Sequence, residues 1–309
     1  MLEVLTGAVT LGLLWAVMTI GVYITYRILN IADLTVEGSI TTGAAIAAVS
    51  ITHGINPYLS VLFALFGGMA AGLITALLHV KLKIPALLSG ILTMIALYSV
   101  NLRIMGKSNI PLLRVNTVYT VMENLGLSRQ TAVMILGLIV VLGFVGILYW
   151  FFGTEIGCAI RATGNNPQMV RAQGINTNTM ISIGLIISNG LVAVSGALIA
   201  QYQSFADIQM GIGSIVIGLA SVIIGEVLFG KMNFYGRLVG LALGAITYRV
   251  IITLVLQLGM SPNDLKLFTA ITVAVALSLP VFRSYLIPIK ASTTRESSNA
   301  QRKKNNKGV

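Results

Sequence analysis

Nine stretches of mainly apolar residues divide this sequence, and each is close to the length that crosses a lipid bilayer as a helix. A spanning helix needs about 20 such residues. The stretches cover residues 4–26, 36–53, 58–80, 85–104, 131–152, 179–200, 211–230, 238–258 and 266–282. Only 9% of the 309 residues are charged, whereas soluble domains carry roughly 25%. The sequence therefore predicts an all-α, multi-spanning membrane protein, in which some stretches are candidates for broken or re-entrant helices.

The two ends of the chain carry different signals. The first stretch has neither a basic leader nor a clear small-residue cleavage site, so we expect it to be retained as the first span. Residues 286–309 are rich in Ser, Asn, Lys and Arg, a composition typical of disordered segments. The sequence therefore predicts one membrane domain over residues 1–285 and a basic tail over residues 286–309.

Lysine and arginine set the expected orientation, because they resist translocation and gather on the cytoplasmic side. An odd number of spans places the termini on opposite sides, and the basic tail favours a cytoplasmic C-terminus and an external N-terminus. The loops then place seven basic residues inside and five outside, so the tail decides the assignment. The inside set is Arg27, Lys81, Lys83, Arg161, Arg171, Lys231 and Arg237, and the outside set is Arg103, Lys107, Arg114, Arg129 and Lys266.

Enzymatic and nucleic-acid functions find little support in the residues present. The net charge is +11, but the basic residues lie at expected helix ends and in the tail, which suits anionic lipid better than nucleic acid. The single cysteine, Cys158, excludes an internal disulfide, and no group of residues has the spacing of a metal site. Residues 225–232, GEVLFGKM, match most of a phosphate-binding loop but end in Met232, where Ser or Thr would hold magnesium. We therefore expect no cofactor on this chain and no catalysis by it.

Two segments resemble each other across the chain. The stretch IADLTVEGSITTGAA begins at Ile31, and FADIQMGIGSIVIGLA begins at Phe205. With one extra residue in the second copy, the aligned pairs are Asp33 with Asp207, Gly38 with Gly213 and Ser39 with Ser214. In the expected orientation the copies enter the membrane from opposite faces, which is typical of the inverted repeats of transporters. The alternative is a chance match between small residues that are common in membrane helices.

Polar side chains within the expected spans are candidates for a path across the membrane. They are Thr41, Thr42, Asn189, Glu226, Tyr248 and Arg249. A charge near the middle of a span is costly and usually faces the protein interior or a wet cavity, which singles out Arg249. Glu226 is its nearest ionic partner in sequence, although at 1.5 Å per residue their depths differ by about 10 Å. The alternatives are a structural or snorkelling arginine, and hydrogen bonds between helices for the others.

The polar stretch between residues 153 and 178 carries the signals of a short helix. Asn166 is a suitable N-cap, Pro167 suits the first helical position, and Gly174 suits the end. The segment consists of Asn166, Pro167, Gln168, Met169, Val170, Arg171, Ala172, Gln173 and Gly174. A helix this short is unstable alone in water, so we expect a groove on a partner to hold it. The alternative is an amphipathic turn on the lipid headgroups.

The same stretch, IGCAIRATGNNPQMVRAQGIN, resembles the cytoplasmic coupling loop of bacterial ABC importer permeases of the branched-chain amino-acid and ribose type. IADLTVEGS resembles the Asp-Leu-Ser-Val-Gly stretch of the ribose-type members, and is most similar to the subgroup associated with tryptophan or tyrosine import. The resemblance extends from the second to the ninth expected span. It implies that residues 153–178 form a coupling loop whose short helix fits a cleft in an ATPase subunit.

The resemblance also implies a set of partners in the bacterial plasma membrane. They are a second copy of the chain or a close relative, two cytoplasmic ATPases that bind ATP and magnesium, and an external substrate-binding protein. The runner-up interpretation is a self-contained secondary transporter or channel, since these also use inverted repeats. Such a protein would couple to ions through intramembrane carboxylates, of which Glu226 is the main example in this sequence.

Overall fold

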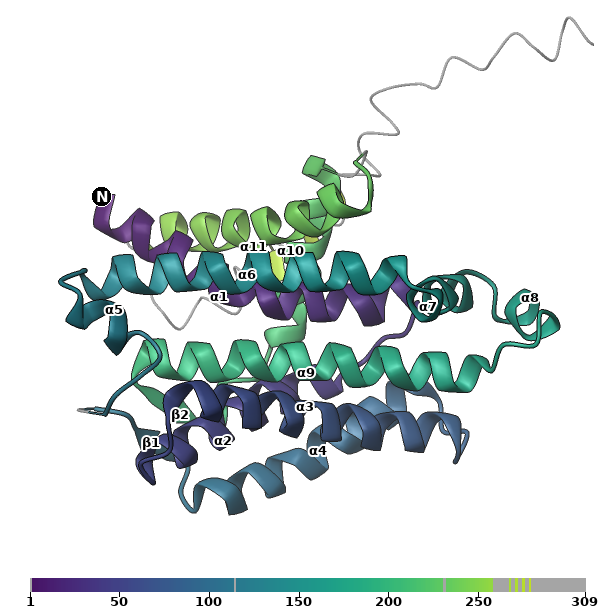
Figure 1. Cartoon of the computed structure of the whole chain (residues 1–309), viewed down its shortest axis with the longest axis horizontal. Helices are drawn as coiled ribbons and strands as arrows, with labels where there is room; N and C mark the ends of the chain where they lie inside the picture. The colour runs from purple at the N-terminus through teal and green to yellow at the C-terminus, as the bar shows by residue number, and fades with distance from the viewer. Residues whose placement is uncertain are drawn as a thin grey trace, which may run out of the picture.

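The computed structural model describes residues 2–113, 115–229 and 232–257, together with 267, 270, 271, 274, 275 and 278. Within these ranges the chain is a bundle of long helices lying side by side (Figure 1), as the apolar stretches predict. The basic tail lies outside the described residues, as does most of the ninth expected span, 266–282.

Every other expected span corresponds to a helix. The long helices are α1 (Leu2–Tyr23), α2 (Thr35–Thr52), α3 (Pro57–Val80), α4 (Ala86–Met105), α6 (Arg129–Gly153), α9 (Thr177–Gln203), α10 (Ser214–Phe229) and α11 (Phe234–Gln257). A π-helical turn, η1 (Ile24–Ile28), continues α1. In the described part of the chain, six helices are long and apolar enough to cross a membrane: α1 with η1, α3, α4, α6, α9 and α11. α10 is shorter, and α2 carries more polar residues.

The bundle has two distinct ends (Figure 1). At one end lie α7 (Glu155–Asn165) and α8 (Pro167–Ala172), which we call the α8 end. At the opposite end, the β end, lie α5 (Thr120–Asn124) and two short strands, β1 (Asn109–Pro111) and β2 (Phe205–Asp207). The strands pair antiparallel with Asn109 opposite Asp207, and so join the loop after α4 to the loop after α9.

The centre of the bundle is formed by α1 with η1 and by α9. In the most apolar window of each, 83% of the residues are buried, compared with 28% in α4 and 33% in α3 and α6. The outer helices expose large apolar side chains, among them Phe66, Ile95 and Trp150. Such wide apolar surfaces are typical of helices that face lipid or another subunit.

Glycines set the spacing of the inner helices. A Cβ added at Gly43 of α2 would meet the backbone oxygen of Ala193, and one added at Gly72 of α3 would meet that of Leu185. Both of these carbonyl oxygens belong to α9, so α2 and α3 pack directly against the backbone of α9. Gly244 of α11 makes the same kind of approach to the backbone of α10. In the absence of a hydrophobic driving force in lipid, this close contact is what packs the helices.

The two aligned aspartates share a local structure. Oδ1 of Asp33 and Oδ1 of Asp207 each accept a hydrogen bond from the backbone N–H two residues later, at 2.9 and 2.8 Å. Oδ2 of each accepts from an asparagine amide, from Asn189 at 2.8 Å and from Asn109 at 3.1 Å. The shared turn supports this part of the predicted repeat.

The aligned glycines differ in their surroundings. Gly38 lies inside α2, whereas Gly213 has a φ of +81° and precedes the first residue of α10, Ser214. The second copy therefore enters its helix later than the first, and the repeat as a whole stays a prediction.

Candidate functional site

The short helix expected over residues 166–174 is present as α8. Asn166 caps it, because its Oδ1 accepts a hydrogen bond from the backbone N–H of Met169 at 3.1 Å. Pro167 occupies the first turn, where its missing N–H costs nothing. Gly174 follows the helix with a φ of +83°, a conformation that favours glycine. The local sequence alone thus determines where α8 begins and ends.

α8 is fixed to the chain at two points and otherwise exposed. Val170 is fully buried, and Nε of Arg171 donates to Oγ1 of Thr177 at 2.7 Å. Met169 is 48% exposed although it is apolar. The other exposed residues of the segment are Asn166, Pro167, Gln168, Arg171, Ala172, Gln173 and Gly174. The apolar side chain of Val170 therefore faces the protein, whereas those of Met169 and Ala172 face outward.

The helix before α8, α7, is absent from the sequence-based expectations. Thr154 caps it by accepting from the backbone N–H of Gly157 at 3.3 Å, and Glu155 stands in its first turn. Ile160 buries its side chain completely, and α7 packs against η1. The cap and the acidic first turn are the signal that would have located this helix.

A buried polar network joins the start of α2 to the middle of α9. Asn189 donates through Nδ2 to Asp33, as described above, and its Oδ1 accepts from the hydroxyl of Ser39 at 2.6 Å. All three side chains are at most 2% exposed. The structure thus brings together two repeat-related residues and one residue expected to line the path.

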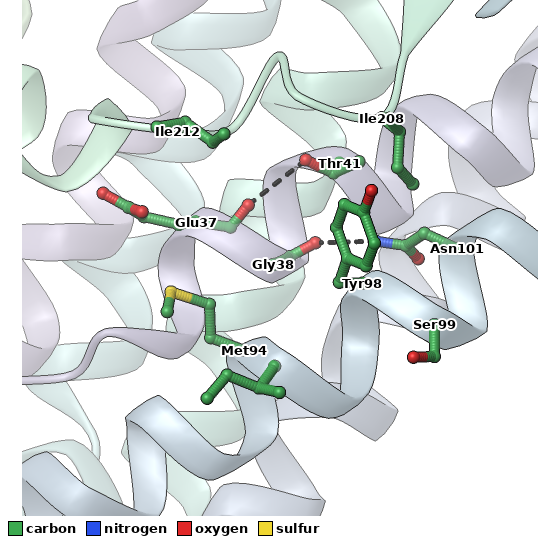
Figure 2. Close-up of a pocket in the computed structure, with 10 residues that line it drawn as sticks. Glu37, Gly38, Thr41, Met94, Tyr98, Ser99, Asn101, Ile208 and Ile212 are labelled. Carbon is green, nitrogen blue, oxygen red and sulfur yellow. Dashed lines mark hydrogen bonds between the residues drawn. The ribbon is translucent and has the colours of Figure 1, made fainter. Parts of the chain in front are cut away.

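Beside this network lies a cavity of about 430 Å³, the Glu37 cavity, between α2, α4 and the loop after β2 (Figure 2). Its lining consists of Glu37, Gly38 and Thr41 from α2, of Met94, Ile95, Tyr98, Ser99 and Asn101 from α4, and of Ile208 and Ile212 from the loop. Figure 2 shows the ring of Tyr98 standing beside Asn101, with Glu37 on the opposite helix. The cavity is mostly apolar with a small number of polar groups, as small-molecule sites are.

The polar groups of the cavity have unused bonding capacity. Glu37 accepts from the backbone N–H of Gly213 at 3.0 Å, which ties α2 to the start of α10. A carboxylate has about four acceptor positions, so a cation can still bind there. Asn101 donates to the carbonyl of Gly38 at 3.3 Å, and its Oδ1 is buried without a partner among the described residues. The site can therefore offer one negative charge and one aromatic ring.

Comparison with known proteins identifies the family. Residues 4–277 match the family described as "Branched-chain amino acid transport system / permease component". The chain belongs to this permease family. It is 43% identical over 272 residues to a tyrosine transport system permease protein of Clostridioides difficile, covering 88% of this chain and 90% of that protein. Permeases of this family serve ABC transport systems.

Two further relatives show how widely the permease family spreads. An uncharacterised protein of Rickettsia prowazekii is 33% identical over 281 residues, covering 90% of this permease and 98% of the relative. A ribose import permease protein of Escherichia coli is 27% identical over 241 residues, covering 75% and 71% of the two chains. The resemblance seen in the loop and in IADLTVEGS is thereby confirmed at the level of the family.

The structure of the permease separates the polar residues expected along a path. Thr41 lines the Glu37 cavity. Thr42 instead donates to the carbonyl of Gly38 at 2.9 Å within its own helix, and Asn189 belongs to the buried network. Tyr248 is 1% exposed and packs in an apolar cluster of α10 and α11. Their roles in transport stay predictions.

The two charged residues of the permease that the sequence singled out as candidates for a path have different surroundings. Arg249 lies over the ring of Trp15, with Cζ 4.3 Å from the ring centroid. Its Nε is buried and has no hydrogen-bond partner among the described residues. Glu226 pairs with Arg27 at 2.8 Å and not with Arg249. A cation–π contact with α1 therefore takes the place of the ion pair that the sequence offered.

Eight of the ten residues that line the Glu37 cavity are absent from the sequence-based candidates, among them Glu37, Tyr98 and Asn101. Glu37 and Asn101 are polar residues within apolar stretches, and that position alone marks a functional candidate. Nothing in the sequence indicated that α2 and α4 would bring them to one cavity.

Proposed function

We propose that this permease is the membrane-spanning subunit of an ATP-driven importer, and that α8 is the segment through which ATPase subunits act on it. The observation that supports this is α8 itself. It is capped at both ends, fixed inward by Val170 and Arg171, and presents an exposed apolar Met169. A helix of this length with an apolar outer residue suits a groove on a partner protein.

The placement of α8 at one end of the bundle and of the N-terminus at the other (Figure 1) supports one orientation in the membrane. The α8 end would face the cytoplasm, with the C-terminus on the same side, and the β end and N-terminus would face outward. In this orientation ATP and magnesium are bound by two partner ATPases, and a second copy of the chain and an external binding protein complete the assembly. The near match to a phosphate-binding loop does not change this, because its residues 225–229 are part of the apolar helix α10.

The substrate that fits best is an amino acid with an aromatic side chain. A relative at 43% identity is a tyrosine transport system permease. In the Glu37 cavity, the carboxylate of Glu37 suits an ammonium group, and the exposed ring of Tyr98 suits stacking against another ring. Exposed Ile95 and Ile212 beside it suit contact with the second copy.

The experiment is to purify the permease with its ATPase from wild type and from Met169→Asp, and to measure co-purification and ATP hydrolysis. A charge at this outward position should remove the ATPase or uncouple hydrolysis from substrate. Met169→Asp is sharper than a change at Arg171, since Arg171 also holds the loop through Thr177.

The matched control is Val121→Asp, which places the same charge on a residue 54% exposed in α5, at the β end. It should leave the ATPase bound. If wild type carries no ATPase and transport into vesicles follows an ion gradient, the runner-up interpretation, a secondary transporter or channel, replaces this one.

A further inference from the structure

A second cavity, of about 620 Å³, lies at the α8 end between η1, α7 and the first turn of α11. We call it the three-arginine pocket. Its lining includes Arg27, Arg161, Arg237, Tyr23, Asn165 and Phe234. Three guanidinium groups, from three separate elements, lie together in this pocket. Neither the fold nor the proposed coupling through α8 requires this concentration of positive charge.

The arginines are only partly neutralised. Arg27 donates through Nε to Glu226 at 2.8 Å, and within the described ranges this is the only carboxylate at ion-pair distance from any of the three. Arg161 lies over the ring of Phe234, with Cζ 5.3 Å from the centroid. Arg237 uses Nε on the carbonyl of Met232 at 3.2 Å. Most of the side-chain N–H groups of the three arginines therefore remain available to a ligand. The arginines also leave a net positive charge in the pocket.

The position of the pocket indicates which anion can reach it. Tyr149, at the end of α6, meets Tyr235 of α11 edge to face at 5.6 Å, and the adjacent Trp150 is 71% exposed. Exposed Trp and Tyr at helix ends mark the level of the lipid headgroups. Phe234, which lines the pocket, is the neighbour of Tyr235 and contacts Phe152 of α6 at 5.4 Å. The pocket therefore lies beside the headgroup level.

We propose that the three-arginine pocket binds a phosphate group, supplied by the headgroup of an anionic phospholipid. Guanidinium groups match phosphate oxygens in pairs, and the pocket offers three of them. The pocket also lies at the N-terminal, positive end of α11, a 24-residue helix. The bound headgroup would join η1, α7 and α11, and so connect the helix that precedes α8 to the bundle.

The test uses the purified full complex in neutral detergent. Dioctanoyl-phosphatidylglycerol, dioctanoyl-phosphatidylcholine and inorganic phosphate are titrated separately, and the unfolding temperature is followed. Wild type should be stabilised by phosphatidylglycerol well beyond phosphatidylcholine. In Arg161→Gln with Arg237→Gln the apparent affinity should fall roughly fivefold for each arginine removed.

Two further variants keep the result interpretable. Arg103→Gln with Lys107→Gln removes the same charge from exposed residues at the far end of α4 and should respond like wild type. Asn165→Asp places a carboxylate among the arginines with little change of shape, and should weaken binding as the double variant does.

The remaining outcomes of the titrations either support or overturn the phosphate site. If inorganic phosphate stabilises wild type as well as the lipid does, and the arginine variant loses that effect, a soluble phosphate compound is the source and the site stands. The proposal is overturned if the arginine variant responds like wild type, or if the control loses as much. It is also overturned if the arginine variant loses the ATPase but keeps its lipid response, because the pocket is then a protein contact.

Discussion

The Glu37 cavity and the three-arginine pocket differ in what holds their walls. The first has one carboxylate, and its α2 wall is fixed by the fully buried hydrogen bonds of Asp33, Ser39 and Asn189. The second has three cations, and its one ion pair joins side chains that are 61% and 28% exposed. Polar groups that are buried are costly to disturb, whereas exposed ones are not. The cavity should therefore tolerate little change, and the pocket should tolerate much.

The largest expected effect is on the buried network. Asn189→Leu leaves the carboxylate of Asp33 and the hydroxyl of Ser39 without their partner, and should lower the free energy of unfolding by about 3 kcal/mol. The matched control is Asn165→Leu, at an exposed asparagine of the three-arginine pocket. Unfolding in a denaturing detergent titration measures both. If the two variants lose the same free energy of unfolding, the wall of the Glu37 cavity is no more sensitive to change than the three-arginine pocket.

The next effect concerns the carboxylate of the Glu37 cavity. Glu37→Gln removes a charge-assisted bond to Gly213 and the one negative charge of the lining, so transport should fall about tenfold or more. Uptake of radiolabelled tyrosine into vesicles is the measurement. Glu3→Gln, at an exposed carboxylate of α1, serves as the control. Unchanged uptake in Glu37→Gln would remove this cavity from the proposed path.

A smaller effect is expected at Tyr98. Tyr98→Leu removes the ring that would stack on an aromatic substrate, and should weaken apparent affinity about fivefold. Tyr98→Phe keeps the ring and should behave nearly as wild type. The half-saturation concentration of uptake distinguishes them. If the Phe variant is as weak as the Leu variant, the hydroxyl and not the ring makes the contact.

The smallest effect is expected at the exposed ion pair. Arg27→Gln or Glu226→Gln should each change the free energy of unfolding by less than about 1 kcal/mol, and less again at high salt. Denaturing titrations at low and high salt, with the double variant completing a cycle, provide the test. A coupling of several kcal/mol would mean that the pocket is held as firmly as the cavity.

Local sequence patterns predicted the positions of the helices well. The limits of α8 follow from Asn166, Pro167 and Gly174, because capping depends only on neighbours in the chain. The apolar stretches likewise predicted each long helix within the described ranges, since helix length in a membrane is set by bilayer thickness. Family membership followed from the same loop.

Contacts between distant residues were beyond prediction. Asp33 and Asn189 are 156 residues apart, and Arg27 and Glu226 are 199 apart. Each pair depends on which face of a helix turns inward, and in helices that are apolar all round the sequence carries little of that information. For the same reason Arg249 was considered with Glu226, whereas the structure places it over Trp15.

The glycine contacts of α2 and α3 with α9 have a mechanical consequence. Helices in backbone contact cannot slide past one another without separating first, so these three should move as a single rigid block. A switch between two access states would then have to occur where side chains fill the gap. The contact between α2 and α4 is such a place, since a Cβ added at Gly38 of α2 would meet the side chain of Leu97 of α4. It marks where a hinge would open.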